Sequence, residues 1–179
     1  MSNVFLFSIE EPAGLSKGAV RDLETLSSLV EEEALRGDLK RIYPDGSCYI
    51  WAVRETEGDS LATWKAVAAG DLLLGCRDHS IVSASFILGK ASHPALSAKL
   101  WGGDSNDPFG LFCFTDRPRV GEVPIVPQMF RYLDPGIRGF AMLPPDKTGN
   151  ILSDYGSFEI FVQLCLRYDF PSNFRHTQD

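Results

Sequence analysis

The sequence predicts an α+β fold, because short apolar strands and short amphipathic helices alternate through its middle part. Residues 72–76 form an apolar run and residues 81–88 alternate between two faces, so we expect two antiparallel strands joined by a polar loop. Helices are predicted on both sides of this hairpin. Residues 60–69 carry an apolar stripe that ends at Gly70, and residues 94–100 begin at a proline, which suits the first turn of a helix.

Length and composition indicate one folded domain. The chain has 179 residues, of which 44% are apolar, which is enough for a hydrophobic core. It contains no apolar run long enough to span a membrane, and its first residues lack the basic and apolar regions of a signal peptide. We therefore expect a soluble protein of the cytoplasm with no membrane partner.

The cysteines are widely separated along the chain: Cys48, Cys76, Cys113 and Cys165. Most of them lie inside apolar runs, and their spacing matches neither a zinc site nor a disulfide framework. The sequence therefore predicts small buried thiols, with no metal and no cofactor.

The net charge of −7 counts against nonspecific coating of DNA, because proteins that depend on phosphate contacts usually carry a basic surface. Much of the acidic excess is local, since Glu31, Glu32 and Glu33 lie among other acidic residues near the N-terminus. Between Lys40 and Arg119 the charges balance, so a basic face is possible in that part of the chain.

The N-terminal part is predicted to pack on the core. Residues 4–9 are expected to form a short strand or an apolar arm. Residues 16–35 have apolar positions with glutamates between them, which predicts an amphipathic helix that ends near Gly37. We interpret residues 1–47 as this arm and helix, and residues 48–54 as the first strand of the core.

The predicted core continues to residue 145, and the chain ends in a helix. The expected elements are a strand at 109–115, an extended edge or connector at 118–127, a helical turn at 129–133, a strand at 138–143 and a helix at 157–168. We interpret residues 48–145 as the core domain and residues 146–179 as a C-terminal helix with a polar tail.

A set of short motifs within this core resembles a known superfamily. They are a strand with Trp51, a helix with Trp64, the Gly-Asp turn before Leu72, a hairpin to Lys90, the segment ALSAKLWGG and an aromatic strand at 109–114. Over about residues 49–143 they resemble the EVE and YTH branch of the PUA-like superfamily, and are similar to the N-terminal reader domains of McrB-type modification-dependent restriction GTPases. The resemblance implies a small twisted β-barrel flanked by helices, with an aromatic pocket for one modified base flipped out of duplex DNA.

The tryptophans are the residues that we expect to form this pocket. Trp64 and Trp101 would flank the base, and Trp51 would form a third wall or the floor. Stacking contributes about 1 to 3 kcal/mol per base, which helps to offset the cost of flipping. Hydrogen bonds to the polar edge of the base are expected from residues in neighbouring loops: Glu55, Ser60, Asp78 and Asp104.

Each tryptophan also has a simpler role as a core residue. Trp64 shares an apolar helical stripe with Leu61 and Val67, and Trp51 lies within a strand that is apolar on both faces. Trp101 borders a Gly-Gly-Asp loop, which allows a ligand to approach closely. Contacts to the nucleic-acid backbone are expected from basic residues of the middle part: Arg54, Lys65, Arg77, Lys90, Lys99, Arg117 and Arg119.

The sequence shows no catalytic motif. It contains no Walker lysine loop, GxSxG elbow, HExxH pair or PD-(D/E)xK nuclease pattern, and its histidines are scattered. We expect a binding domain for modified double-stranded DNA and no enzyme, with the GTPase and nuclease of the restriction complex elsewhere. Two alternatives remain open. One is a PUA-like or ASCH-like protein that binds RNA or a modified nucleoside, or hydrolyses one; the other is a protein-interaction module that uses the acidic first helix.

Overall fold

The computed structural model describes residues 2–9, 16–54, 59–101, 109–136 and 139–168, without the side chains of residues 16–19 and of Trp101. The strands are β1 (Val4–Ser8), β2 (Ser16–Asp22), β3 (Ser47–Val53), β4 (Leu72–Arg77), β5 (Ser80–Ser92), β6 (Leu111–Thr115), β7 (Arg119–Pro124) and β8 (Phe140–Met142). The helices are α1 (Leu23–Leu29), α2 (Glu33–Ile42), α3 (Ser60–Ala66), α4 (Pro94–Trp101), α5 (Pro145–Tyr155) and α6 (Phe158–Leu164), with a short 3₁₀ helix, η1 (Pro127–Met129). The predicted α+β class is confirmed.

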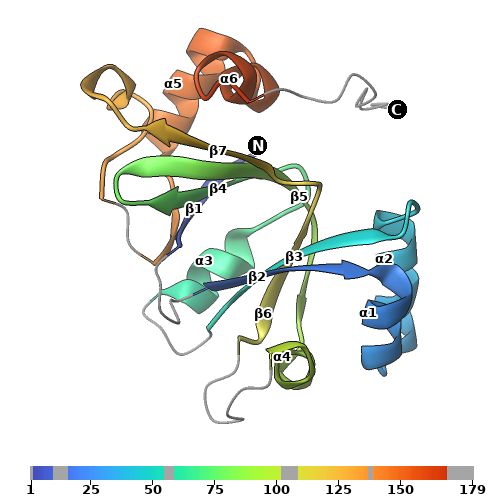
Figure 1. Cartoon of the computed structure of the whole chain (residues 1–179). Helices are drawn as coiled ribbons and strands as arrows, with labels where there is room; N and C mark the ends of the chain where they lie inside the picture. Colours follow the sequence, from blue (N-terminus) through green and yellow to red (C-terminus); the bar gives the residue numbers. More distant parts are fainter. Residues whose placement is uncertain (1, 10–15, 55–58, 102–108, 137–138, 169–179) are drawn as a thin grey trace.

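The strands form one mixed, eight-stranded sheet that is not closed. Its order is β2-β3-β6-β5-β4-β1-β8, and β7 pairs with β5 outside this path (Figure 1). β1 is parallel to β4 and antiparallel to β8, so the N-terminal segment lies inside the sheet. β2 continues the sheet at the other end by pairing with β3. The sequence predicts a short strand or an apolar arm at residues 4–9, and β1 is such a strand; the strand β2 is not predicted.

β5 joins the two halves of the sheet, because it is long enough to pair with three other strands. Residues 80–86 pair with β4, and residues 80–84 also pair with β7 on the opposite side. Residues 87–92 then pair with β6, after a register shift between Ile87 and Gly89. Side chains of β1 and β3 meet in the interior, so the two halves of the sheet face each other across a common core.

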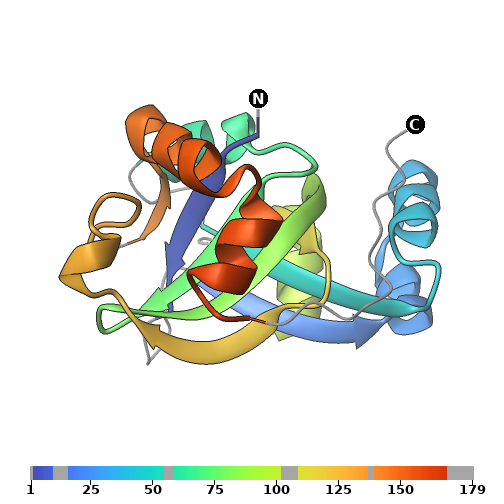
Figure 2. The same cartoon turned by 90° about the horizontal axis from the view of Figure 1, so that it is seen from above.

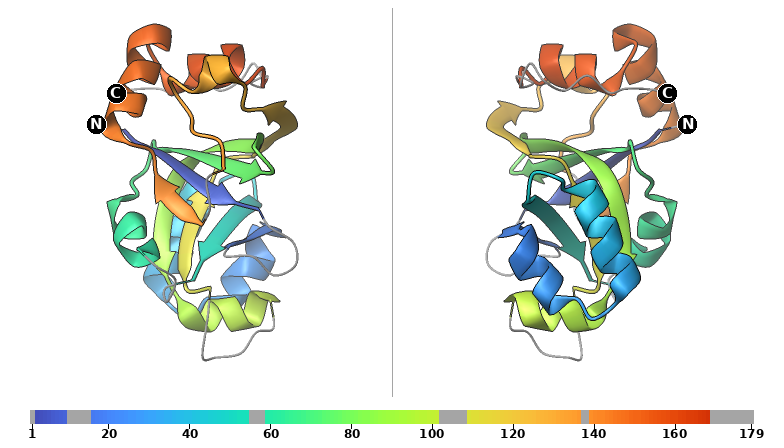
Figure 3. Two further views of the ribbon diagram at one scale, coloured as in Figure 1. Left: turned by 90° about the vertical axis from the view of Figure 1, so that its left-hand side faces the viewer. Right: turned by 90° about the vertical axis from the view of Figure 1, so that its right-hand side faces the viewer.

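Helices cover the outer faces of both halves, and a third cluster of side chains fills the space between them. α5 and α6 pack on β1, β4 and β5, whereas α1, α2 and α4 pack on β3 and β6. These two groups of helices lie at different ends of the molecule (Figure 2, Figure 3). We call the third cluster the inner core; it contains side chains of β1, β3 and β6, together with Trp64 of α3 and Val67 directly after that helix.

One helix prediction is wrong, and one helix is not predicted. Residues 16–35 are not one helix, because the first of them pair with β3 as β2, and α1 and α2 follow separately. Asp22 marks the change, since its carboxylate accepts a hydrogen bond from the Thr25 N–H at 2.8 Å and caps α1. The sequence also misses α5, because Pro144 and Pro145 read as the end of a strand. Proline is tolerated in the first helical turn, and Pro145 begins α5.

The other predicted elements are confirmed within a few residues. They are the strand at 48–54 (β3), the helix at 60–69 (α3), the hairpin (β4 and β5), the helix at 94–100 (α4), the strand at 109–115 (β6), the extended edge at 118–127 (β7), the strand at 138–143 (β8) and the terminal helix (α6). None of the helices in the described ranges combines the length and the apolar composition that a membrane span requires.

Candidate functional site

Trp51 lies in the inner core with part of its surface exposed. It is a β3 residue whose register partners are Gly18 of β2 and Cys113 of β6. Its ring centroid lies 4.1 Å from that of Phe7 on β1, with 47° between the ring planes, and the side chain is half-buried. Gly18 carries no side chain, and a glycine inside a strand often marks a place where a ligand or another segment comes close. Trp51 therefore remains a candidate wall for a bound base.

Trp64 has a structural role, which corrects its predicted place as a wall of the pocket. Only 9% of its surface is exposed, and it packs in the inner core. Its indole N–H donates to the main-chain oxygen of Phe112 at 3.1 Å, and the Lys90 ammonium lies 4.8 Å from the ring centroid. A buried ring with its N–H bonded to the sheet and a cation over its face is not available for stacking with a base.

The other predicted pocket residues are not brought together around Trp51 in the part of the chain that the structure describes. Glu55 and Asp104 lie outside the described residues, as does the side chain of Trp101 at the end of α4. Ser60 is buried at the start of α3. Asp78 is exposed at the tip of the β4–β5 hairpin. The length of β4, roughly 20 Å, separates it from the connection between α3 and β4. Asp78 is therefore no partner for a base beside Trp64, which corrects that prediction.

Lys90 shares a register row with Trp51. Cys113 lies between them, because it pairs with Trp51 on one side and with Lys90 on the other. The Lys90 ammonium donates hydrogen bonds to the main-chain oxygens of Trp64 at 3.1 Å and of Lys65 at 2.7 Å. These oxygens belong to the last turn of α3, so Lys90 ties this helix to the sheet while the residue itself stays exposed.

Arg119 is a buried structural residue, which corrects its predicted role as a phosphate contact. Its Nη1 lies 2.9 Å from Oδ2 of Asp116, and only 8% and 3% of the two side chains are exposed. The guanidinium also lies over the ring of Phe86. A cation that neutralises a buried carboxylate cannot leave it for a phosphate without a large loss of stability.

The other residues predicted to contact the nucleic-acid backbone differ in their interactions within the protein. Arg77 lies 3.9 Å from a glutamate of β7, and Arg54 lies over the ring of Phe109, 4.6 Å from its centroid. Lys65 and Arg117 are exposed. These residues lie on different elements, and a common basic face stays a prediction.

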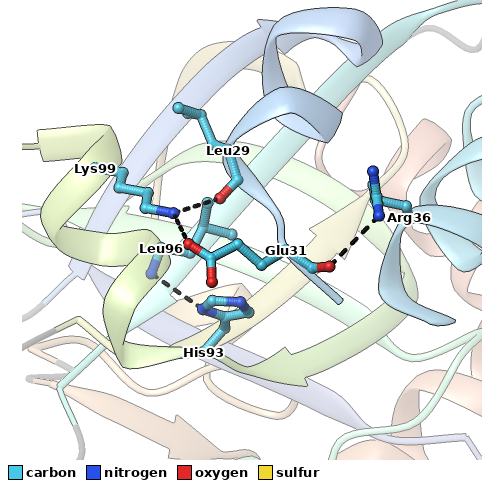
Figure 4. A network of polar contacts seen from close by, with 6 residues as sticks. All are labelled: Leu29, Glu31, Arg36, His93, Leu96 and Lys99. Atoms are coloured by element: carbon cyan, nitrogen blue, oxygen red, sulfur yellow. Dashed lines mark hydrogen bonds and ion pairs between the residues drawn. The ribbon is translucent and has the colours of Figure 1, made fainter. Parts of the chain in front are cut away.

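Lys99 belongs to a polar network that joins α4 to the connection between α1 and α2 (Figure 4). Its ammonium donates to the Leu29 main-chain oxygen at 3.1 Å and lies 2.9 Å from a carboxylate oxygen of Glu31. His93 caps α4, since its Nδ1 accepts the Leu96 N–H at 3.0 Å. The Lys99 ammonium therefore ties α4 to the end of α1 and the connection that follows it, and its role as a phosphate contact stays a prediction.

Two residues of the inner face escape prediction from the sequence. Phe7 lies in a segment predicted as a short strand or an apolar arm, and nothing local indicates that this strand pairs between β4 and β8. Thr115 reads as the end of an apolar strand, yet its hydroxyl is fully buried and has no hydrogen-bond partner. Thr115 pairs with Ile87 of the inner core, so this unpaired group lies on the same side of the sheet as Trp51. Such a group costs about 1 to 3 kcal/mol.

The described residues offer little material for metal or thiol chemistry. No group of three or more His, Cys, Asp and Glu side chains among them is arranged to hold a metal ion. Burial raises the pKa of the Cys76 and Cys113 thiols to about 12, so both stay protonated at neutral pH. An open depression beside α1 is lined by Asp22, Glu24 and Lys40 and does not include the inner core.

Trp51, Phe7 and Lys90 thus form the candidate site: a partly exposed indole backed by a second aromatic ring, with an ammonium group farther along the same register row. Comparisons with models of protein families, with curated proteins and with solved structures found no match to the chain.

Proposed function

We propose that the chain is a binding domain that recognises a modified base, of the methylated class, in double-stranded DNA and holds it flipped out against Trp51. The observation that carries the proposal is the position of Trp51, half-buried between the halves of the sheet with its ring 4.1 Å from that of Phe7. An indole held by a second aromatic ring is a rigid stacking surface for a planar base. We assign no catalytic step to the chain.

We further propose that the sheet is an open form of the PUA-like barrel of the EVE and YTH type. β5 supports this proposal, because it pairs with strands of both halves, and so does the inner core that the halves share. With that fold, the chain would act as the reader module of a modification-dependent restriction system in the cytoplasm. Its partners would be modified double-stranded DNA and the GTPase and nuclease components of that system.

Stacking would supply much of the affinity, and the added methyl group would supply the selectivity. A base–aromatic contact contributes about 1 to 3 kcal/mol, while flipping the base costs a few kcal/mol. A pocket that senses one methyl group by size discriminates by about 1 to 3 kcal/mol. We therefore expect moderate affinity for a single site and a preference for the modified duplex that is measurable but limited.

The proposal is tested with duplexes that carry one methylcytosine, methyladenine or hydroxymethylcytosine, each compared with the unmodified duplex of the same sequence. We expect at least one modified duplex to bind about tenfold more tightly than its unmodified counterpart. Trp51→Ala should bring this ratio close to one. Equal affinity of the native protein for all modified and unmodified duplexes would falsify the proposal.

Phe130→Ala is the matched control. Phe130 follows η1, is 42% exposed and does not belong to the inner core. Its replacement therefore removes an accessible aromatic ring that is not packed with Trp51. We expect it to leave the modified-to-unmodified ratio unchanged. If Phe130→Ala reduces the ratio as much as Trp51→Ala does, the effect does not come from the inner face.

The same screen separates the alternative functions. Stacking on an indole does not distinguish DNA from RNA, so modified single-stranded RNA and free modified nucleosides are included as ligands. Tighter binding of these ligands than of modified duplex would favour a protein that binds RNA or a modified nucleoside. Conversion of the ligands to products would favour a hydrolase. Absence of any Trp51-dependent binding would leave the acidic N-terminal region as the candidate interaction surface.

A further inference from the structure

Lys90 differs from Lys99, Lys147 and Arg119 in what holds it. The ammonium groups or guanidinium groups of Lys99, Lys147 and Arg119 each pair with a carboxylate. Lys90 is held by the main-chain oxygens of Trp64 and Lys65, and among the described residues no carboxylate forms an ion pair with it. The Lys90 side chain is thus fixed in place by main-chain oxygens, and no carboxylate of the described residues neutralises it.

The geometry at Lys90 also leaves a hydrogen-bond donor available. A lysine ammonium has three N–H donors, and the contacts at 3.1 Å and 2.7 Å to the carbonyls of α3 use two of them. The C-terminal end of a helix carries partial negative charge, which stabilises the ammonium at this position before any ligand arrives. An anion that reaches the exposed side of Lys90 therefore meets a preorganised cation.

Lys90 and Trp51 lie two strands apart on one register row. Two strand-to-strand steps separate them, through Cys113, which corresponds to roughly 10 Å between their backbones. The indole and the lysine side chain both project from the same side of the sheet toward the inner core. A nucleotide carries its base and its phosphate on opposite ends of a ribose, so one ligand of this kind offers a group to each of the two side chains.

We infer that Lys90 binds the phosphate of the nucleotide whose base stacks on Trp51. The inference rests on the proposed function and narrows it: the ligand class is a modified nucleotide with its phosphate, and a free base or nucleoside lacks one of the two anchoring groups. Lys90 is then a binding residue of the site, beyond its contacts to α3.

The test compares the deoxynucleosides of methylcytosine, methyladenine and hydroxymethylcytosine with their monophosphates, using quenching of tryptophan fluorescence by each ligand. For the native protein we expect the monophosphate of the preferred base to bind about tenfold more tightly than its nucleoside, the effect of one hydrogen bond to a charged group. Lys90→Met should bring this ratio close to one and leave the affinity for the nucleoside unchanged. Lys90→Arg should retain most of the ratio.

Lys147→Met is the matched control, because Lys147 likewise donates to a main-chain oxygen, that of Phe130, but lies outside the inner core. It should retain the phosphate preference. A Lys90→Met variant that loses affinity for nucleoside and monophosphate equally would show a purely structural lysine and overturn the inference, as would a native protein without phosphate preference. Either of these two results leaves the proposed function intact if the native protein prefers the modified duplex and Trp51→Ala abolishes that preference. If the native protein shows no such preference, the proposed function itself is wrong.

Discussion

The main-chain N–H of Phe86 donates a hydrogen bond to Oδ1 of Asp116 at 2.7 Å, at the point where β5 exchanges one neighbour for another. The Asp116 N–H in turn donates to the Phe86 carbonyl at 2.9 Å, so the two residues bond to each other in both directions. Oδ2 of Asp116 lies 2.9 Å from the Arg119 guanidinium at the start of β7. One buried carboxylate thus ties β5, the end of β6 and the start of β7 together.

Asp116→Ala is expected to lower the free energy of unfolding by about 3 to 5 kcal/mol, because it leaves the buried Arg119 guanidinium without its partner. Chemical denaturation monitored by tryptophan fluorescence measures the change. Asp38→Ala is the control, since Asp38 pairs with Arg41 on the surface of α2. The control should cost no more than about 0.5 kcal/mol, and similar losses in the two variants would contradict the role that we assign to Asp116.

Trp64→Ala is expected to destabilise the protein by about 3 to 5 kcal/mol, because the ring is buried in the inner core and its N–H is bonded to Phe112. Trp51→Ala should cost clearly less, since its ring is only half-buried. Thermal unfolding of the two variants under one set of conditions makes the comparison. If Trp51→Ala proves the more destabilising change, Trp51 is the core residue of the pair and its use as a stacking surface becomes untenable.

Gly121→Ala is expected to destabilise the fold by about 1 to 3 kcal/mol, because an added Cβ would lie 2.6 Å from Cε1 of Tyr168. The Tyr168 hydroxyl is placed between the carbonyls of Ile81 and Gly121, at 2.9 and 3.1 Å, so the ring has little freedom to move away. Gly37→Ala provides the opposite case. Gly37 lies inside α2 with open space around it, and alanine there should stabilise the protein by about 0.5 to 1 kcal/mol. In urea titrations, the free energy of unfolding should fall for Gly121→Ala and rise for Gly37→Ala.

Stability should fall in alkaline solution because of the buried thiols. Burial raises the pKa of Cys113 to about 12 in the folded protein, whereas an unfolded cysteine titrates near pH 8.5, about its ordinary value. The contribution of the Cys113 thiol to the free energy of unfolding is therefore fully present below the pKa of the thiol in the unfolded chain. It is lost as the pH rises through the pKa of the thiol in the folded protein, since unfolding then releases a proton. Unfolding curves at a series of pH values between these limits measure the slope. Cys113→Ala should make that slope shallower, and an unchanged slope would contradict the assignment.

The sequence predicts well those elements whose apolar pattern is local. β3, the β4–β5 hairpin, α4 and β6 each combine an unambiguous apolar pattern with clear turn or proline signals at their ends, so the strand or helix period is legible without the rest of the chain. The prediction for the segment that contains β2 and α1 is wrong, because its apolar spacing fits both a helix and a strand. Pairing with β3 decides that ambiguity in favour of a strand as far as Asp22.

The candidate site shows the same division. The sequence predicts Trp51 as a member of the pocket, and the structure leaves its ring partly exposed, so this stays a prediction. Trp64 and Arg119 carry the residue types that a nucleic-acid reader needs, yet burial assigns the first to the core and a carboxylate binds the second. Exposure and pairing depend on residues far away in the sequence, so composition and spacing do not reveal them.

By itself, the sequence determined the α+β class, the central hairpin and the helices around it, because these follow from local periodicity and from glycine and proline at the boundaries. Only the tertiary structure decided that β1 lies between β4 and β8, that Phe7 packs against Trp51, and that the ammonium of Lys90 is held at the end of α3. The physical reason is that each of these contacts joins segments whose own sequences contain no information about the partner, and only the packing of the whole sheet brings them together.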